Sequence, residues 1–311
     1  MNRSYITALC LAMVLFGWGI SWELLPLQTG GPDLPRATVP VFYRFLFAGS
    51  LFTLFIIARD VWRGQITFAF PPHIWGLVAL KGVGFFSLNY SLFYFGQQAL
   101  PPGIVALFFS FVVITNLGMT MVFTGRPPRR STAFAAFIGF MGLVGVLSPS
   151  IWADGGIELD VLTLRHAGVC LLGTMVVSLA TRVQVRLNTL GVPVVTSTAF
   201  AMLFGTTYVG LFSLWQGFSF DISAAPTSFY WALALLVVFG SIGGFSAYLK
   251  LVGLIGPNRG AYVNLGTAVV ALIISYFAGT GDDLTVGQFG GIALILLGCY
   301  LILRDKTPAP S

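Results

Sequence analysis

The sequence predicts an all-α integral membrane protein of ten transmembrane helices, arranged as two inverted five-helix repeats. Three observations predict this fold. Of the 311 residues, 57% are hydrophobic and only 8% are charged, whereas about a quarter of the residues in a soluble domain are charged. Ten apolar windows are long enough to cross about 30 Å of hydrocarbon. One pattern also recurs at close to half the chain length, as in a duplicated transmembrane unit.

The first half, residues 1–150, is expected to form one repeat. Prolines mark its breaks, for example Pro71 and Pro72, because proline stops or opens a helix. Helices are expected throughout, since the alternating pattern of a transmembrane strand is absent. The five windows have the limits 5–22, 39–58, 73–97, 102–123 and 131–149.

The second half, residues 151–311, is expected to form the second repeat, and the two halves together one transport domain. Its breaks are again marked by prolines, at Pro193, Pro226 and Pro257. The five windows have the limits 164–185, 194–215, 228–251, 258–278 and 285–303.

The duplication is clearest between residues 90–147 and residues 245–301. Each copy ends one apolar run, breaks at a proline, and continues with two further runs, of which the last is rich in glycine. The matched positions include Ser91 with Ser246, Pro102 with Pro257, and Ala106 with Ala261. Five spans per copy is an odd number, so the copies must cross the membrane in opposite orientations. This layout predicts a site near the midplane of the membrane, between the halves.

The charged residues predict the orientation. If the N-terminus is cytoplasmic, ten basic residues fall in the inner breaks and only Arg36 and Arg165 in the outer ones, as the positive-inside rule requires. The ten are Arg3, Arg59, Arg63, Arg126, Arg129, Arg130, Arg186, Arg259, Arg304 and Lys306. The outer breaks hold the acidic residues Glu23, Asp33, Asp154, Glu158, Asp160, Asp221, Asp282 and Asp283. We therefore expect a multi-pass protein of the cell (inner) membrane with both termini in the cytoplasm.

Three short motifs resemble a known family. They are Trp18-Gly19 in the first span, Pro40-x-x-x-Arg44-Phe45-x-x-Ala48 in the second, and Ala99…Gly103-x-x-Ala106-Leu107 at the start of the fourth. In this order, and with ten spans in two halves, they resemble the EamA-type branch of the drug/metabolite transporter superfamily. The resemblance implies a secondary transporter that works by alternating access and exports a small amphipathic metabolite such as an amino acid.

Two cations and one carboxylate are candidates for this function. Arg44 and Lys81 lie well inside their spans, where a charge costs roughly 3 kcal/mol, so we expect a hydrated cavity beside them. Lys81 is expected to contact substrate, and Asn89 shares its face two turns later. For Arg44 the alternative is a structural anchor between helices. Glu23, at the outer end of the first span, is either a proton-coupling residue or an ordinary interfacial glutamate.

The remaining candidates are aromatic and amide side chains. Tyr90 and Tyr94 share a helical stripe, Trp18 and Tyr248 place polar ring atoms within the spans, and Asn264 needs a hydrogen-bond partner there. Interhelical hydrogen bonding is the alternative to ligand contact for these groups. Together they predict a site with aromatic walls, amide donors and a cationic end, which suits a small amphipathic metabolite carrying a carboxylate.

Other classes of function lack their signatures. There is no HExxH, GxSxG or P-loop motif, so we expect no enzyme, no cofactor and no direct use of ATP. Three scattered cysteines and two distant histidines predict no metal site. The expected partners are a small-molecule substrate, the lipid bilayer, and a proton or counter-substrate, but no nucleic acid. The alternatives are a carrier for a nucleotide, nucleoside or other organic anion, or a membrane-embedded enzyme or assembly factor.

Overall fold

The computed structural model describes most of the chain as helix. The described residues are 3–29, 31, 33–100, 102–125, 127, 129–152, 160–255, 260, 262–278 and 285–304. Within these ranges no strand occurs. The expected outer loop at Asp154–Asp160 lies outside them except for Asp160, as does the proline break at Pro257.

Seven of the described helical segments have the length and hydropathy to cross a membrane. They are Ser4–Gln28, Thr38–Arg63, Pro72–Gly96, Ile104–Thr124, Val161–Thr189, Val194–Trp215 and Thr227–Ile255. Two shorter apolar helices, Arg130–Val146 and Val286–Leu301, fall in two further predicted windows. The all-helical, multi-pass membrane class is thereby confirmed, whereas the count of ten spans in inverted repeats stays a prediction.

Each half contains one helix that changes its hydrogen-bonding pattern partway. In the first half the helices are α1 (Arg3–Leu24), the 3-10 turn η1 (Leu25–Gln28), α2 (Thr38–Arg63), α3 (Pro72–Gly82), the π-helical turn η2 (Val83–Leu88), α4 (Asn89–Gly96), α5 (Pro102–Ser110), α6 (Val112–Thr124) and α7 (Arg130–Trp152). In the second half they are α8 (Val161–Thr189), α9 (Val194–Trp215), α10 (Thr227–Leu235), the π-helical turn η3 (Leu236–Gly243), α11 (Gly244–Ile255), α13 (Val263–Ala278) and α14 (Val286–Arg304). Windows 73–97 and 228–251 are thus not regular helices. Such π-helical turns often occur at functional sites.

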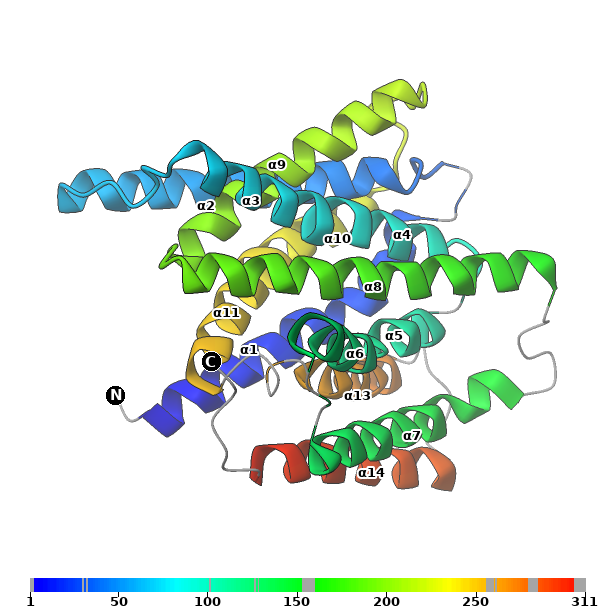
Figure 1. Cartoon of the computed structure of the whole chain (residues 1–311). Coiled ribbons are helices and arrows are strands. Elements are labelled where there is room, and N and C mark those ends of the chain that lie inside the picture. The colour runs from blue at the N-terminus through cyan, green and yellow to red at the C-terminus, as the bar shows by residue number, and fades with distance from the viewer. Residues whose placement is uncertain are drawn as a thin grey trace.

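The helices of the two sequence halves are interleaved. α2 packs against α9, α1 against both α11 and α13, α4 against α8, and α7 against α14. In Figure 1, α7 and α14 lie side by side along one edge of the molecule, α2 and α3 lie along the opposite edge, and α8 runs between them. The described helices of the first half therefore pack directly against those of the second.

Glycine permits the closest of these helix contacts. A Cβ atom built on Gly142 of α7 would lie 2.6 Å from the carbonyl oxygen of Gly291 in α14, and one built on Gly291 would lie 2.5 Å from the carbonyl oxygen of Gly142. Any larger residue at either position would push the helices apart. Small residues at contacts of this kind are usual in membranes, where helix association depends on close backbone approach.

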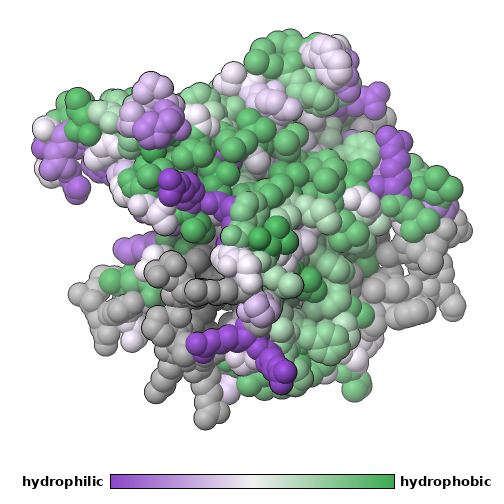
Figure 2. All heavy atoms as spheres, viewed as in Figure 1, coloured by the Kyte–Doolittle hydropathy of each residue, from purple (hydrophilic) through white to green (hydrophobic). Residues whose placement is uncertain are grey.

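The outer surface is apolar, as a bilayer requires. Large hydrophobic side chains are exposed on several helices, among them Leu54, Phe55, Val122, Leu211 and Trp231. Figure 2 shows hydrophobic residues over much of the visible face, with hydrophilic residues gathered mainly toward its margins. In a soluble protein a surface of this extent would indicate aggregation or a partner, but in a membrane protein it is the lipid-facing surface.

A capping residue explains why α8 begins before the window predicted at residue 164. The Asp160 carboxylate accepts a hydrogen bond from the backbone N–H of Thr163 at 2.7 Å and so caps the helix. This hydrogen bond is the main reason that the pKa of the Asp160 carboxyl lies below its usual value. The helix therefore starts at Val161, outside the apolar window.

Candidate functional site

A cavity lies among helices of both halves. Its lining comes from α1, η1, α2, η2, α4, α5 and α6 in the first half, and from α8, α11 and α13 in the second. It contains about 820 Å³ of space, counting the part that opens to its surroundings. The lining is mostly apolar with a few convergent polar groups, as is usual for small-molecule sites.

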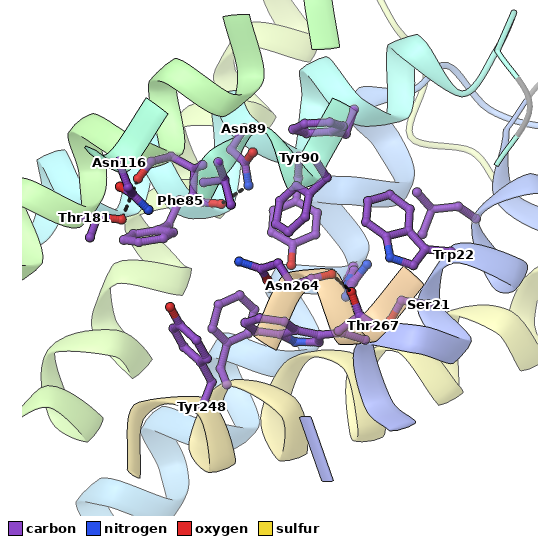
Figure 3. Close-up of a pocket in the computed structure, with 18 residues that line it drawn as sticks. Ser21, Trp22, Phe85, Asn89, Tyr90, Asn116, Thr181, Tyr248, Asn264 and Thr267 are labelled. Atoms are coloured by element: carbon purple, nitrogen blue, oxygen red, sulfur yellow. Dashed lines mark hydrogen bonds between the residues drawn. The ribbon is translucent and has the colours of Figure 1, made fainter. Parts of the chain in front are cut away.

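Aromatic rings form a large part of the cavity wall. The centroid of the Trp18 ring lies 4.9 Å from that of Tyr248 and 5.3 Å from that of Phe245. The Trp22 ring contacts Phe109 with a centroid separation of 5.5 Å. Figure 3 shows Trp22 and Ser21 at one end of the cavity, and Asn116 and Thr181 at the other.

Arg44 supplies the cation of the described lining. Its side chain is only 1% exposed. Its Nε donates to the Ser241 hydroxyl at 3.0 Å, its Nη1 donates to the Tyr94 hydroxyl at 3.4 Å, and its guanidinium carbon lies 4.8 Å from the centroid of the Tyr90 ring. Tyr94 in turn donates to Oε1 of Gln28 at 2.9 Å. These partners of Arg44 are neutral. The ion pair among the described residues joins Arg59 to Asp60 and does not involve Arg44.

Trp18 is held by the same second-half segment as Arg44. Its indole Nε1 donates to the carbonyl oxygen of Gly240 at 3.0 Å. Gly240 and Ser241 are adjacent in the π-helical turn η3. One turn of the second half therefore fixes two first-half residues of the cavity.

Carboxamide groups provide hydrogen-bond acceptors toward the end of the cavity where Asn116 lies. Asn89 is 3% exposed, and its Nδ2 donates to the carbonyl oxygen of Phe85 at 3.5 Å. The Oδ1 atoms of Asn89 and Asn116 are both buried, with no hydrogen-bond partner in the described part of the chain. The backbone carbonyl of Asn264 accepts from Thr267 at 2.7 Å, and both of these residues line the cavity (Figure 3).

The structure brings most of the sequence-predicted site residues together. The cavity is lined by Trp18, Arg44, Asn89, Tyr90, Tyr248 and Asn264. Tyr94 is fully buried beside the lining and reaches it through its hydrogen bond with Arg44. Glu23 is half-buried in α1, next to the lining residue Trp22 but not itself in the lining.

Lys81 lies outside the lining of this cavity. It is 2% exposed, at the contact between α3 and α9. Its Nζ donates to the hydroxyls of Thr198 at 2.6 Å and Ser197 at 3.3 Å. The substrate contact expected of Lys81 stays a prediction.

Several residues of the site were not selected from the sequence. Ser241 and Thr267 have no feature that separates them from other serines and threonines in apolar runs. Arg182 does have such a feature, since it is a charge within window 164–185. It donates to the carbonyl oxygen of Asn116 at 3.2 Å and to the Thr120 hydroxyl, so it anchors the helix that carries one lining carboxamide.

The described side chains contain no group of three histidine, cysteine or acidic residues that could hold a metal ion. The polar groups of the cavity can instead bind a small organic molecule through hydrogen bonds. Arg44 offers N–H donors to an anionic group, and the carboxamide oxygens accept from a donor group.

Comparisons with known proteins agree with this architecture. Residues 166–304 match the family model described as the EamA-like transporter family. No curated protein matches the chain. One similar solved structure, titled only "Crystal structure of protein", has a TM-score of 0.72 and 16% sequence identity, with 96% of each chain covered. At that identity the likeness concerns the fold.

The matched segment covers α8 to α14, apart from the first residues of α8, and so includes the second-half wall of the cavity. EamA-like proteins are membrane transporters for small molecules, in keeping with a multi-pass chain that surrounds a central cavity. Residues 166–304, the greater part of the second half, are thus similar to the EamA-like transporter family.

Proposed function

We propose that this transporter is a secondary carrier that exports a small amphipathic metabolite bearing a carboxylate, such as an amino acid, through the central cavity. The observation that carries the proposal is Arg44, a buried guanidinium in the cavity lining whose described partners are neutral. Burying a charge without a counter-charge is costly. A ligand carboxylate would supply the counter-charge, through charge-assisted hydrogen bonds of about 1.5–3 kcal/mol.

The remaining groups fit the rest of such a ligand. The rings of Trp18, Trp22 and Tyr248 suit an apolar or aromatic body. The Oδ1 atoms of Asn89 and Asn116 suit an ammonium or another N–H donor, because buried acceptors are normally satisfied. A nucleotide, which carries several negative charges, is less well matched, since Arg44 is the one cationic side chain in the described lining.

The proposed mechanism is alternating access by two inverted repeats of five helices. Ser91 and Ser246 set the displacement between the copies at 155 residues. The same displacement carries the π-helical turn η2 onto η3, except for the first two residues of η3. It also relates pairs of cavity residues: Trp22 with Val177, Tyr90 with Phe245, Phe93 with Tyr248, Phe109 with Asn264, and Val112 with Thr267.

The helix contacts support the same two-fold relationship. α3 and η2 pack on α9, and η3 packs on α2 in the equivalent manner. The same displacement relates α4 to α11 and α1 to α8. Likewise, α1 packs on α11 and α4 packs on α8. If the two halves exchange conformations, the cavity opens to the other side of the membrane without moving its residues far. Location in the inner membrane, both termini in the cytoplasm, and proton coupling through Glu23 complete the proposal.

Transport into proteoliposomes tests the proposal. A mixture of amino acids, hydroxy acids, nucleosides and nucleotides is offered to vesicles containing the wild type or Arg44→Gln, with and without a pH gradient. We expect uptake of one or more carboxylates by the wild type and little uptake by the variant. Arg63→Gln, at an exposed arginine near the end of the same helix, is the control. Transport of neutral nucleosides alone, or equal carboxylate uptake in Arg44→Gln, would contradict the proposal.

A further inference from the structure

Arg44 is held in place by a segment of the other half of the chain. The Ser241 hydroxyl accepts from its Nε at 3.0 Å, and Ser241 is completely buried. The preceding residue, Gly240, leaves the space that the guanidinium occupies, because a Cβ built there would lie 2.9 Å from Nη2 of Arg44 and 2.7 Å from the Ser21 hydroxyl. Both residues belong to the π-helical turn η3.

The contacts leave the ligand-binding end of the guanidinium available. Arginine has five N–H donors. One is used by Ser241 and one by Tyr94, and no described hydrogen bond uses the two donors of Nη2. The Tyr90 ring covers one face of the group. Arg44 is therefore fixed through Nε while Nη1 and Nη2 keep donors that can bind a carboxylate in the planar, two-point geometry that arginine favours.

We propose that Ser241 and Gly240 are positioning residues that make the cavity selective for an anionic group. Ser241 fixes the rotation of the guanidinium plane, and Gly240 provides the room for it. Without the Ser241 acceptor the guanidinium would rotate among neighbouring acceptors, and a carboxylate would have to restrict that motion on binding. This inference rests on the proposed function, because it assumes that Arg44 receives the anionic group of a ligand.

One short π-helical turn makes both contacts. The carbonyl of Gly240 accepts a hydrogen bond from Trp18 and the side chain of Ser241 accepts one from Arg44, so two consecutive residues hold two residues of the cavity lining. Turns of this kind are frequent at functional sites. The corresponding turn of the first half, η2, contributes Phe85 to the cavity directly.

Binding of two matched probes tests the inference. Purified protein is titrated with 3-phenylpropionate, which carries a carboxylate, and with 3-phenylpropionamide, its neutral counterpart. Quenching of tryptophan fluorescence reports binding, since Trp18 and Trp22 line the cavity. We expect the wild type to prefer the acid, and Ser241→Ala to lower that preference about five- to tenfold while binding the amide as before. Gly240→Ala should act in the same direction.

Matched variants separate positioning from a loss of structure. Ser87→Ala truncates a buried serine of the other π-helical turn, and Gly253→Ala adds a methyl group to α11 where nothing lies within 4 Å; neither should change the preference. Ser241→Cys, of similar size but a poorer acceptor, should give an intermediate preference, and it replaces Ser241→Ala if that variant does not fold.

The outcomes distinguish this inference from the proposed function. A wild type that binds neither probe, or both equally, overturns the carboxylate proposal and this inference with it. A wild type that prefers the acid while Ser241→Ala keeps the same preference overturns this inference alone. A Ser241→Ala variant that loses affinity for both probes equally also overturns this inference, because that result would indicate a structural role for Ser241.

Discussion

Lys81 of the first half donates a hydrogen bond to Thr198 of the second half, with 2.6 Å between Nζ and Oγ1. Both side chains are at most 2% exposed. The hydroxyls of Thr198 and Ser197 themselves donate to the carbonyl oxygen of Val194, so their lone pairs face the ammonium. A buried cation with hydroxyl partners thus links α3 to α9, apart from the cavity.

Replacement of Lys81 should therefore affect stability more than ligand binding. Lys81→Ala leaves a cavity between α3 and α9, and we expect a loss of about 2–4 kcal/mol in stability. Lys81→Met fills the same space without a charge to bury, so its melting temperature should stay close to that of the wild type. Thermal unfolding in detergent and cavity affinity are measured together. A tenfold loss of affinity in Lys81→Met with an unchanged melting temperature would restore the substrate role.

Arg44 should control affinity for the carboxylate. Arg44→Gln removes the charge but keeps hydrogen-bonding capacity, and we expect affinity for a carboxylate substrate to fall about ten- to a hundredfold. Arg44→Lys should recover part of this loss, because an ammonium retains the charge but cannot reproduce the planar contacts with Ser241 and Tyr94. Isothermal titration of the three proteins gives the comparison. Full recovery in Arg44→Lys would argue against two-point recognition.

Asn89 should report on the donor group of the ligand. Asn89→Leu is nearly isosteric and removes the buried Oδ1, which has no hydrogen-bond partner in the described part of the chain. We expect binding of L-phenylalanine to weaken about three- to tenfold, while 3-phenylpropionate, which lacks the ammonium, binds as before. Asn188→Ala, at an exposed asparagine of α8, is the control. An equal loss for both ligands would place Asn89 in a packing role.

Glu23 is the proposed coupling residue, and its half-buried position next to Trp22 suits exchange of a proton with solvent near the cavity. Glu23→Gln should abolish accumulation driven by a pH gradient but leave downhill exchange of labelled substrate largely intact. The control is Asp33→Asn, at an exposed carboxylate. Gradient-driven accumulation at the wild-type level in Glu23→Gln would show that Glu23 is an interfacial residue without a coupling role.

The orientation follows from the positive-inside pattern and can be tested by labelling single cysteines in a background without Cys10, Cys170 and Cys299. Gln65 and Asp221 are both exposed, in breaks predicted to be cytoplasmic and external respectively. An impermeant thiol reagent added to intact cells should label Asp221→Cys and leave Gln65→Cys unmodified. The reverse result would invert the whole arrangement.

Hydropathy and composition were sufficient for the membrane class and for most helix positions. The reason is that the bilayer acts on each segment separately: a window of about twenty apolar residues is a sufficient condition for a span, whatever its neighbours are. The position of Arg44 well inside its span likewise made it a candidate for the site, because a charge within a membrane helix is costly however that helix packs. The motifs around Trp18 and Arg44 selected the family whose model matches residues 166–304.

Tertiary structure decided which of these side chains meet. A sequence window indicates how deep a residue lies but not which way its helix is rotated. Arg44 and Lys81 were therefore both expected beside the cavity, and packing places Arg44 in its lining and Lys81 against α9. The π-helical turns at 83–88 and 236–243 have no hydropathy signal, since they change the backbone and not the composition. Ser241 lies 197 residues from Arg44 in the chain, and only the packing of η3 against α2 brings its hydroxyl to the guanidinium.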